Sequence, residues 1–94
     1  MTKANTKILH IEGGKNVYGG ALQVYYLIRE LSKHTINNVL VCPKSSDLVA
    51  KAAPYSKVIG LDMKSDIDFI LLFQIIKILK KEKPDLVHLH SRRI

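Results

Sequence analysis

The sequence has no tryptophan, three prolines and a single cysteine in 94 residues. One cysteine forms no intramolecular disulfide, so Cys42 excludes a small secreted fold held together by disulfides. The spacing of cysteine and histidine matches no common metal motif, and no metal is expected. Residues 1–7 lack the pattern of a signal peptide. A reducing, cytoplasmic setting follows as the expectation.

Acidic residues are also scarce, with eight Asp and Glu against fifteen Lys and Arg, which gives a net charge of +7. This balance favours anionic partners without indicating which kind. The hydrophobic share of 47% and the charged share of 24% are ordinary for a folded protein, which excludes a disordered or collagen-like chain. The length predicts one small domain.

Apolar periodicity predicts strands that alternate with helices after a frayed segment at 1–6. The expected strands are Lys7–Ile11, Val39–Cys42, Lys57–Leu61 and Leu86–His90. The expected helices are Ala21–His34, Asp47–Ala53 and Asp66–Lys81. The pair Asn37-Asn38 is interpreted as a turn, and Ser45 or Ser46 as the cap of the second helix.

This alternation predicts a Rossmann-like, three-layer α/β/α fold with a parallel sheet, because each helix returns the chain to the same end of the sheet. The expected strand order is 3-2-1-4, with ligands at the carboxyl ends near the switch between strands one and four. The apolar strand Leu86–His90 would then lie at an edge, which folded proteins usually cover. We therefore expect a partial domain, and an edge through which the chain could form an oligomer.

The segment Glu12–Gly20 contains two glycine pairs between the first strand and the first helix. Glycine lets a phosphate approach the backbone, and a helix start offers unpaired N–H groups, so this turn predicts an anion cradle. It is not a P-loop, because Gly20-Ala21 replaces the lysine and hydroxyl, and it lacks the dinucleotide fingerprint G-x-G-x-x-G. The residues expected to converge on one rim are Glu12, Gly13, Gly14, Gly19, Gly20, His90 and Ser91.

Four stretches together suggest a family. They are Lys7–Ile11, the run Tyr18-Gly19-Gly20-Ala21 opening a helix that contains Leu27-Ile28-Arg29-Glu30-Leu31, the strand Asn38–Pro43, and the run Lys83-Pro84-Asp85 through Ser91. In this order and spacing, the chain resembles the N-terminal domain of GT-B fold glycosyltransferases of the family 4 type. The resemblance covers nearly all of the chain and implies a truncated protein.

The resemblance implies two Rossmann-like domains that face each other across a cleft, with the nucleotide-sugar donor held mainly by a C-terminal domain absent from this sequence. It also implies transfer with retention of configuration and no metal cofactor. Gly19 and Gly20 match the family's glycine pair beside the donor, and Gly13-Gly14 extend that loop. His90 matches the histidine at the end of the fourth strand, as a catalytic residue beside the transferred sugar, and Ser91 follows it. An imidazole there could donate to a sugar hydroxyl or stabilise charge on the leaving group.

Structural roles are the alternatives. Gly19-Gly20 could form only a tight turn, while His10 is expected in the core and His88 packed under a helix. Cys42 is expected to be a small buried hydrophobic residue. The lysines at 77, 80, 81 and 83 fit a solvated helix face.

The predicted function is the N-terminal part of a glycosyltransferase, inactive alone, whose partners are a nucleotide sugar and a glycan or lipid-linked acceptor. The alternative is a non-catalytic α/β binding or interaction module left by an interrupted gene. The lysines beside Ile70 and Phe73 suggest peripheral contact with an anionic membrane at its inner face. No nucleic-acid partner is expected, because the aromatic residues do not alternate with basic ones.

Overall fold

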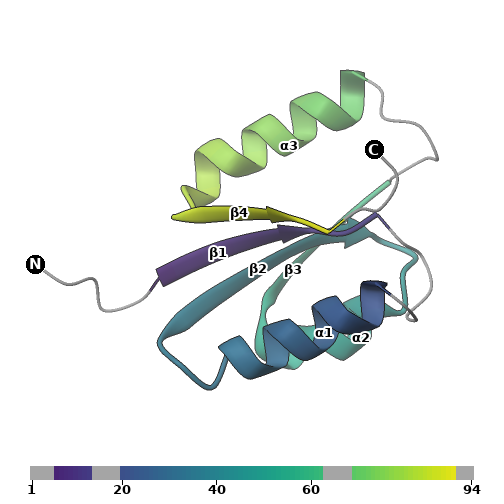
Figure 1. Ribbon diagram of the computed structural model, residues 1–94. Helices are drawn as coiled ribbons and strands as arrows, with labels where there is room; N and C mark the ends of the chain where they lie inside the picture. Colours follow the sequence, from purple (N-terminus) through teal and green to yellow (C-terminus); the bar gives the residue numbers. More distant parts are fainter. Residues whose placement is uncertain (1–5, 14–19, 63–68, 91–94) are drawn as a thin grey trace, which may run out of the picture.

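The computed structural model of this protein describes residues 6–13, 20–62 and 69–90. Within these ranges, the chain forms one sheet from β1 (Thr6–Ile11), β2 (Ile36–Pro43), β3 (Lys57–Leu61) and β4 (Leu86–Leu89). All three strand pairs are parallel and the order is β3-β2-β1-β4 (Figure 1). The predicted Rossmann-like fold and its strand order are therefore confirmed.

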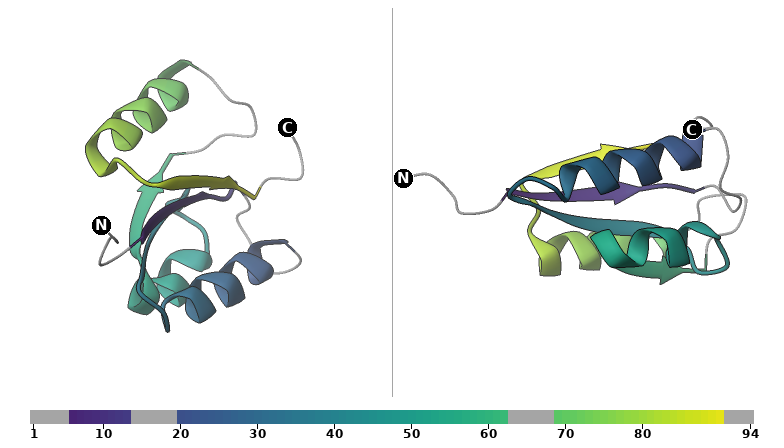
Figure 2. Two further views of the ribbon diagram at one scale, coloured as in Figure 1. Left: turned by 60° about the vertical axis from the view of Figure 1, so that its left-hand side comes forward. Right: turned by 90° about the horizontal axis from the view of Figure 1, so that it is seen from below.

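Helices cover both faces of this sheet. They are α1 (Gly20–Leu31), α2 (Leu48–Ala52), the short 3-10 helix η1 (Ala53–Tyr55) and α3 (Phe69–Glu82). Figure 1 and Figure 2 show α1 and α2 on one face and α3 on the other. None of the helices within the described ranges has the length and apolar character needed to cross a membrane.

The core has one apolar layer on each face of the sheet, because neighbouring residues of a strand point to opposite sides. In β2, Leu40 and Cys42 pack with Val24 and Ile28 of α1. Val39 and Val41 point the other way and pack with Leu9, beneath Ile78 and Leu79 of α3. Both faces of β2 are thus buried, as the nearly continuous apolar run Val39–Cys42 predicts.

Two expectations about the sheet are wrong. Asn37-Asn38 is no turn, because β2 begins at Ile36 and pairs Asn37 with Lys7 and Asn38 with Ile8. Thr6 is not frayed, since it pairs with Ile36 and its N–H donates to the Thr35 carbonyl at 3.1 Å. In both cases, pairing between distant strands extends the regular structure beyond the local sequence signal.

Helix ends also differ from expectation. Helix α1 ends at Leu31 rather than at His34, and the chain turns before β2. Helix α2 begins at Leu48, and its N-cap is Asp47, which makes no side-chain cap hydrogen bond, so neither predicted serine is the cap residue. The Leu48 N–H does donate to Ser46 Oγ at 3.0 Å. The expected start of the third helix, Asp66, lies outside the described residues.

Strand β4 is the exposed edge predicted from the sequence. All four of its residues are exposed, and Leu86 and Leu89 keep 56% and 59% of their surface accessible. Phe73 of α3 is 64% exposed. The apolar surface of this part of the fold is therefore incompletely covered among the described residues.

Candidate functional site

The carboxyl ends of β1 and β4 lie side by side at the end of the sheet toward which its parallel strands run. His90, the residue after β4, donates its backbone N–H to the Ile11 carbonyl at 2.9 Å, so the two strand ends lie side by side. Figure 1 shows the beginning of α1, at Gly20, at this same end of the sheet. The predicted meeting of the strand tips and the helix start is therefore present.

The described members of the expected rim differ in their surroundings. Gly13 is exposed, and a Cβ placed on it would meet no atom within 4 Å. Glu12 is only 6% exposed, and its N–H donates to the Val41 carbonyl at 2.9 Å. The other expected site residues, Gly14, Gly19 and Ser91, lie outside the described residues.

Three histidines gather on the face of the sheet that α1 covers. His10 is fully buried in β1, and its register partner in β4 is His88. Because alternate residues of a strand share a face, His90, two residues after His88, lies on the same face as His10 and His88. The ring centroids lie 5.2 Å apart for His10 and His90, and 3.8 Å apart for His88 and His90.

A hydrogen-bond chain assigns the protons of this cluster. Asn38 Nδ2 donates to the Ile28 carbonyl at 3.3 Å, so Asn38 Oδ1 is the atom that lies 3.0 Å from His10 Nε2. An amide oxygen only accepts, and therefore His10 carries its proton on Nε2 and keeps a lone pair on Nδ1. His90 Nε2 lies 3.0 Å from that Nδ1 and must donate to it. In a neutral His90, the second nitrogen, Nδ1, is then an acceptor.

Burial favours the neutral forms of His10 and His90. Burial, with smaller contributions from the neighbouring His88 and His10, lowers the pKa of His90 to about 4. Burial also lowers the pKa of His10, against the opposing effect of the hydrogen bond to Asn38. A neutral His90 can accept a hydrogen bond from a sugar hydroxyl through Nδ1, whereas the role expected from the sequence is donation or stabilisation of charge on the leaving group.

Sequence reasoning missed most of this cluster. His10 is in the core as predicted, but its contact with His90 was not foreseen. His88 is exposed rather than packed under a helix, because it stands on the edge strand. Asn38 was interpreted as a turn residue. The available signal was the alternation of His88 and His90, which places both on one face of a strand adjacent to β1.

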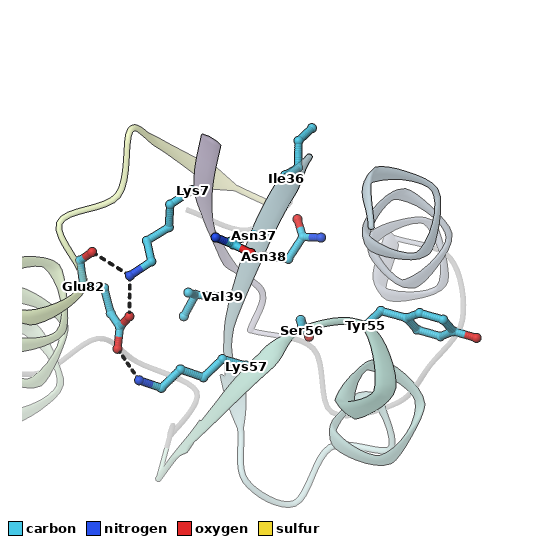
Figure 3. Close-up of a pocket in the computed structure, with 9 residues that line it drawn as sticks. All are labelled: Lys7, Ile36, Asn37, Asn38, Val39, Tyr55, Ser56, Lys57 and Glu82. Carbon is cyan, nitrogen blue, oxygen red and sulfur yellow. Dashed lines mark hydrogen bonds and ion pairs between the residues drawn. The ribbon is translucent and has the colours of Figure 1, made fainter. Parts of the chain in front are cut away.

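A pocket of about 420 Å³ lies at the opposite, amino-terminal edge (Figure 3). Glu82, the last residue of α3, lies there between two lysines: its carboxylate accepts from Lys7 Nζ at 3.0 Å and from Lys57 Nζ at 2.7 Å. Lys7 Nζ also donates to the Glu82 carbonyl at 2.9 Å. These contacts tie α3 to β1 and β3, so we assign this pocket a structural role.

Comparison with known proteins identifies a family. The sequence pattern of Glycosyltransferase Family 4 matches residues 17–93, which is most of the chain and extends from before α1 to beyond β4. No curated protein and no solved structure gives a significant match.

Proposed function

We propose that this chain, which belongs to glycosyltransferase family 4, forms the N-terminal part of an enzyme that transfers a sugar from a nucleotide-sugar donor to a glycan or lipid-linked acceptor. The observation that carries the proposal is the position of His90. Its backbone is hydrogen-bonded to the end of β1, and its ring is held by His10 at the edge where α1 begins. Ligands of open parallel sheets bind at this edge.

In this proposal, His90 is the catalytic-site residue beside the transferred sugar. Its neutral ring accepts a hydrogen bond from a sugar hydroxyl and orients the sugar. The loop of Gly13, Gly14, Gly19 and Gly20 approaches the donor, where the beginning of α1 offers backbone N–H groups and a partial positive charge to a phosphate. Ser91 contributes a hydroxyl to the same rim. The transfer retains the configuration of the sugar and uses no metal cofactor.

We further propose that these 94 residues alone have no transferase activity, because the donor of the proposed enzyme would be bound mainly by a second domain. Without that domain, the energy of binding the donor would not be available to lower the barrier to sugar transfer. The protein would act in the cytoplasm, and at the inner face of the membrane for a lipid-linked acceptor. Exposed Phe73 and the basic last turn of α3 suit such a surface.

The test is an amide NMR titration of the uniformly ¹⁵N-labelled chain with a panel of nucleotide sugars. We expect shifts concentrated at Gly13, Gly20 and His90, and weaker binding in the His90→Ala variant. His34, an exposed residue near the amino-terminal edge, supplies the matched control His34→Ala, which should bind like the wild type. Shifts concentrated at the pocket between Lys7 and Glu82, or equal binding by the wild type and His90→Ala, would contradict the proposal and favour a non-catalytic module.

A second measurement tests the proposed inactivity. The purified chain is incubated with each nucleotide sugar, and release of the nucleotide is followed. We expect no turnover above the rate without protein. Detectable turnover would show that this chain needs no second domain.

A further inference from the structure

We infer that His10, His88 and His90 form a binding site for a divalent transition metal ion of the zinc class. Each residue offers one ring nitrogen, and these three atoms lie within 4.8 Å of one another. This inference goes beyond the proposed sugar transfer, which uses no metal. The two share His90, so an ion bound here would alter the ring that the transfer uses and would not serve as its cofactor.

The two neighbouring strands already hold two of the ligands close together. His10 Nδ1 and His90 Nε2 are 3.0 Å apart. Two nitrogens bound to one tetrahedral ion at about 2.1 Å each lie roughly 3.4 Å from one another, so the pair needs to open by about 0.4 Å and both rings need to turn their lone pairs toward the ion. His88 is exposed on the edge strand and can change rotamer to bring its nitrogen to the same ion.

The surroundings of His10 are those of a metal-binding histidine. Such residues donate their other ring N–H to a carbonyl or carboxylate oxygen, which fixes the tautomer and directs the lone pair at the metal. His10 Nε2 donates to Asn38 Oδ1, and the Asn38 amide is in turn anchored on the Ile28 carbonyl. The Nδ1 lone pair of His10 is therefore oriented toward the space between the rings.

Metal binding requires one proton to change place. His90 carries its proton on Nε2 in the hydrogen bond to His10, and this proton must leave so that Nε2 can bind the ion. Water takes it up and another proton binds His90 Nδ1, so the ring remains neutral and no net proton is released. A metal ion would thus turn His90 Nδ1 from an acceptor into a donor.

The ligand set selects the kind of ion. Imidazole nitrogens suit Zn²⁺, Co²⁺, Ni²⁺ and Cu²⁺, whereas Mg²⁺ and Ca²⁺ prefer carboxylate and carbonyl oxygens. Three protein ligands leave one position of a tetrahedral ion for water or another oxygen ligand. We therefore assign the site to an ion of the zinc class and use Zn²⁺ as its probe.

The experiment uses the 94-residue chain without an affinity tag, freed of metal with a chelator. Zn²⁺ binding is measured by calorimetry, and Co²⁺ binding by its visible absorption. We expect one ion per chain. His88→Ala should weaken binding by at least about tenfold, since loss of a ligand costs no less than loss of a supporting hydrogen bond. His34→Ala removes a histidine outside the cluster and should leave the affinity within about twofold of the wild type.

Exposure of His88 makes His88→Ala safe for the fold, which circular dichroism checks, and His88→Gln serves as a second variant. Equal Zn²⁺ affinity in the wild type and both His88 variants would overturn the inference. So would a folded wild-type chain that binds no Zn²⁺, or one from which a hundredfold excess of Mg²⁺ displaces it. A Co²⁺ spectrum that changes with His88 but not with His34 would support it.

Discussion

His10 Nδ1 and His90 Nε2 lie 3.0 Å apart although the two residues are 80 positions apart in the sequence. The contact joins the central strand β1 to the edge strand β4 on the face covered by α1. It gives a buried imidazole the second partner that it needs, because an unsatisfied polar group in the core is costly. It also fixes the proton of His90, the residue that we place in the catalytic site, on Nε2.

The first prediction concerns the tautomers of these rings. In metal-free buffer at pH 7, long-range ¹H–¹⁵N spectra should show His10 and His90 as neutral rings protonated on Nε2. The reason is that the Asn38 oxygen can only accept from His10, which leaves His10 Nδ1 to accept from His90. Protonation of His90 on Nδ1 under these conditions would refute the proposed chain. Exposed His34 provides the reference for a ring that is not held in this way.

A second prediction concerns the stability contributed by Asn38, which is 4% exposed. Asn38→Leu should lower the free energy of unfolding by about 1–3 kcal/mol, because it leaves the buried His10 Nε2–H without its acceptor. Urea denaturation gives the difference. The neighbouring Asn37 is exposed, and Asn37→Ala should change stability by less than about 0.5 kcal/mol. Equal effects of the two substitutions would contradict a role for Asn38 in holding His10.

The third prediction is a pH dependence that comes from Glu82. Hydrogen bonds from Lys57 and Lys7 lower the pKa of this carboxyl below its ordinary value of 4.5. Because the folded state binds the proton more weakly than the unfolded state, the stabilisation is complete above about pH 4.5 and is lost as the pH falls through the lower folded value. Glu82→Gln should therefore destabilise the protein at pH 7, by about 1–2 kcal/mol, and flatten the loss of stability in acid.

Denaturant melts at a series of pH values measure this effect. Glu30 offers the control, since its ion pair with Lys33 at 3.0 Å joins two exposed side chains three residues apart at the end of α1. Glu30→Gln should leave both the stability and its acid dependence unchanged within error, because exposed ion pairs contribute little. If both variants behave alike, the contact of α3 with β1 and β3 through Glu82 has no energetic importance.

The fourth prediction compares two glycines. A Cβ at Gly60 would lie 2.8 Å from Lys44 Cβ and 2.9 Å from Lys44 Cα, so the strand end would have to move. Gly60→Ala should cost about 1–3 kcal/mol, as overpacking does elsewhere. Gly13 has open space around the same position, and Gly13→Ala should keep the stability within about 0.5 kcal/mol of the wild type. Thermal melts distinguish the two, and an unchanged Gly60→Ala protein would refute the close approach.

Much of the fold follows from local pattern. The apolar run Val39–Cys42 predicts a strand buried on both faces, and the helical period of residues 66–81 predicts a helix with one apolar side. Alternation of such units leaves few topologies, because parallel crossovers are right-handed. Element ends were less certain, since pairing with a distant strand decided where β1 and β2 begin. Asn38 shows the error: its local preference is for a turn, but β1 provides a pairing partner and His10 a hydrogen-bond donor.

The order of strands and helices, the partly covered edge strand and the family are determined by the sequence itself, because they depend on periodicity and on motifs that can be read along the chain. The histidine cluster depends on the tertiary structure. Only the register between β1 and β4 brings His10 opposite His88 and beside His90, and only Asn38 on β2 decides which ring nitrogen carries the proton. Contacts between side chains so far apart in sequence arise from strand pairing, which no local pattern specifies.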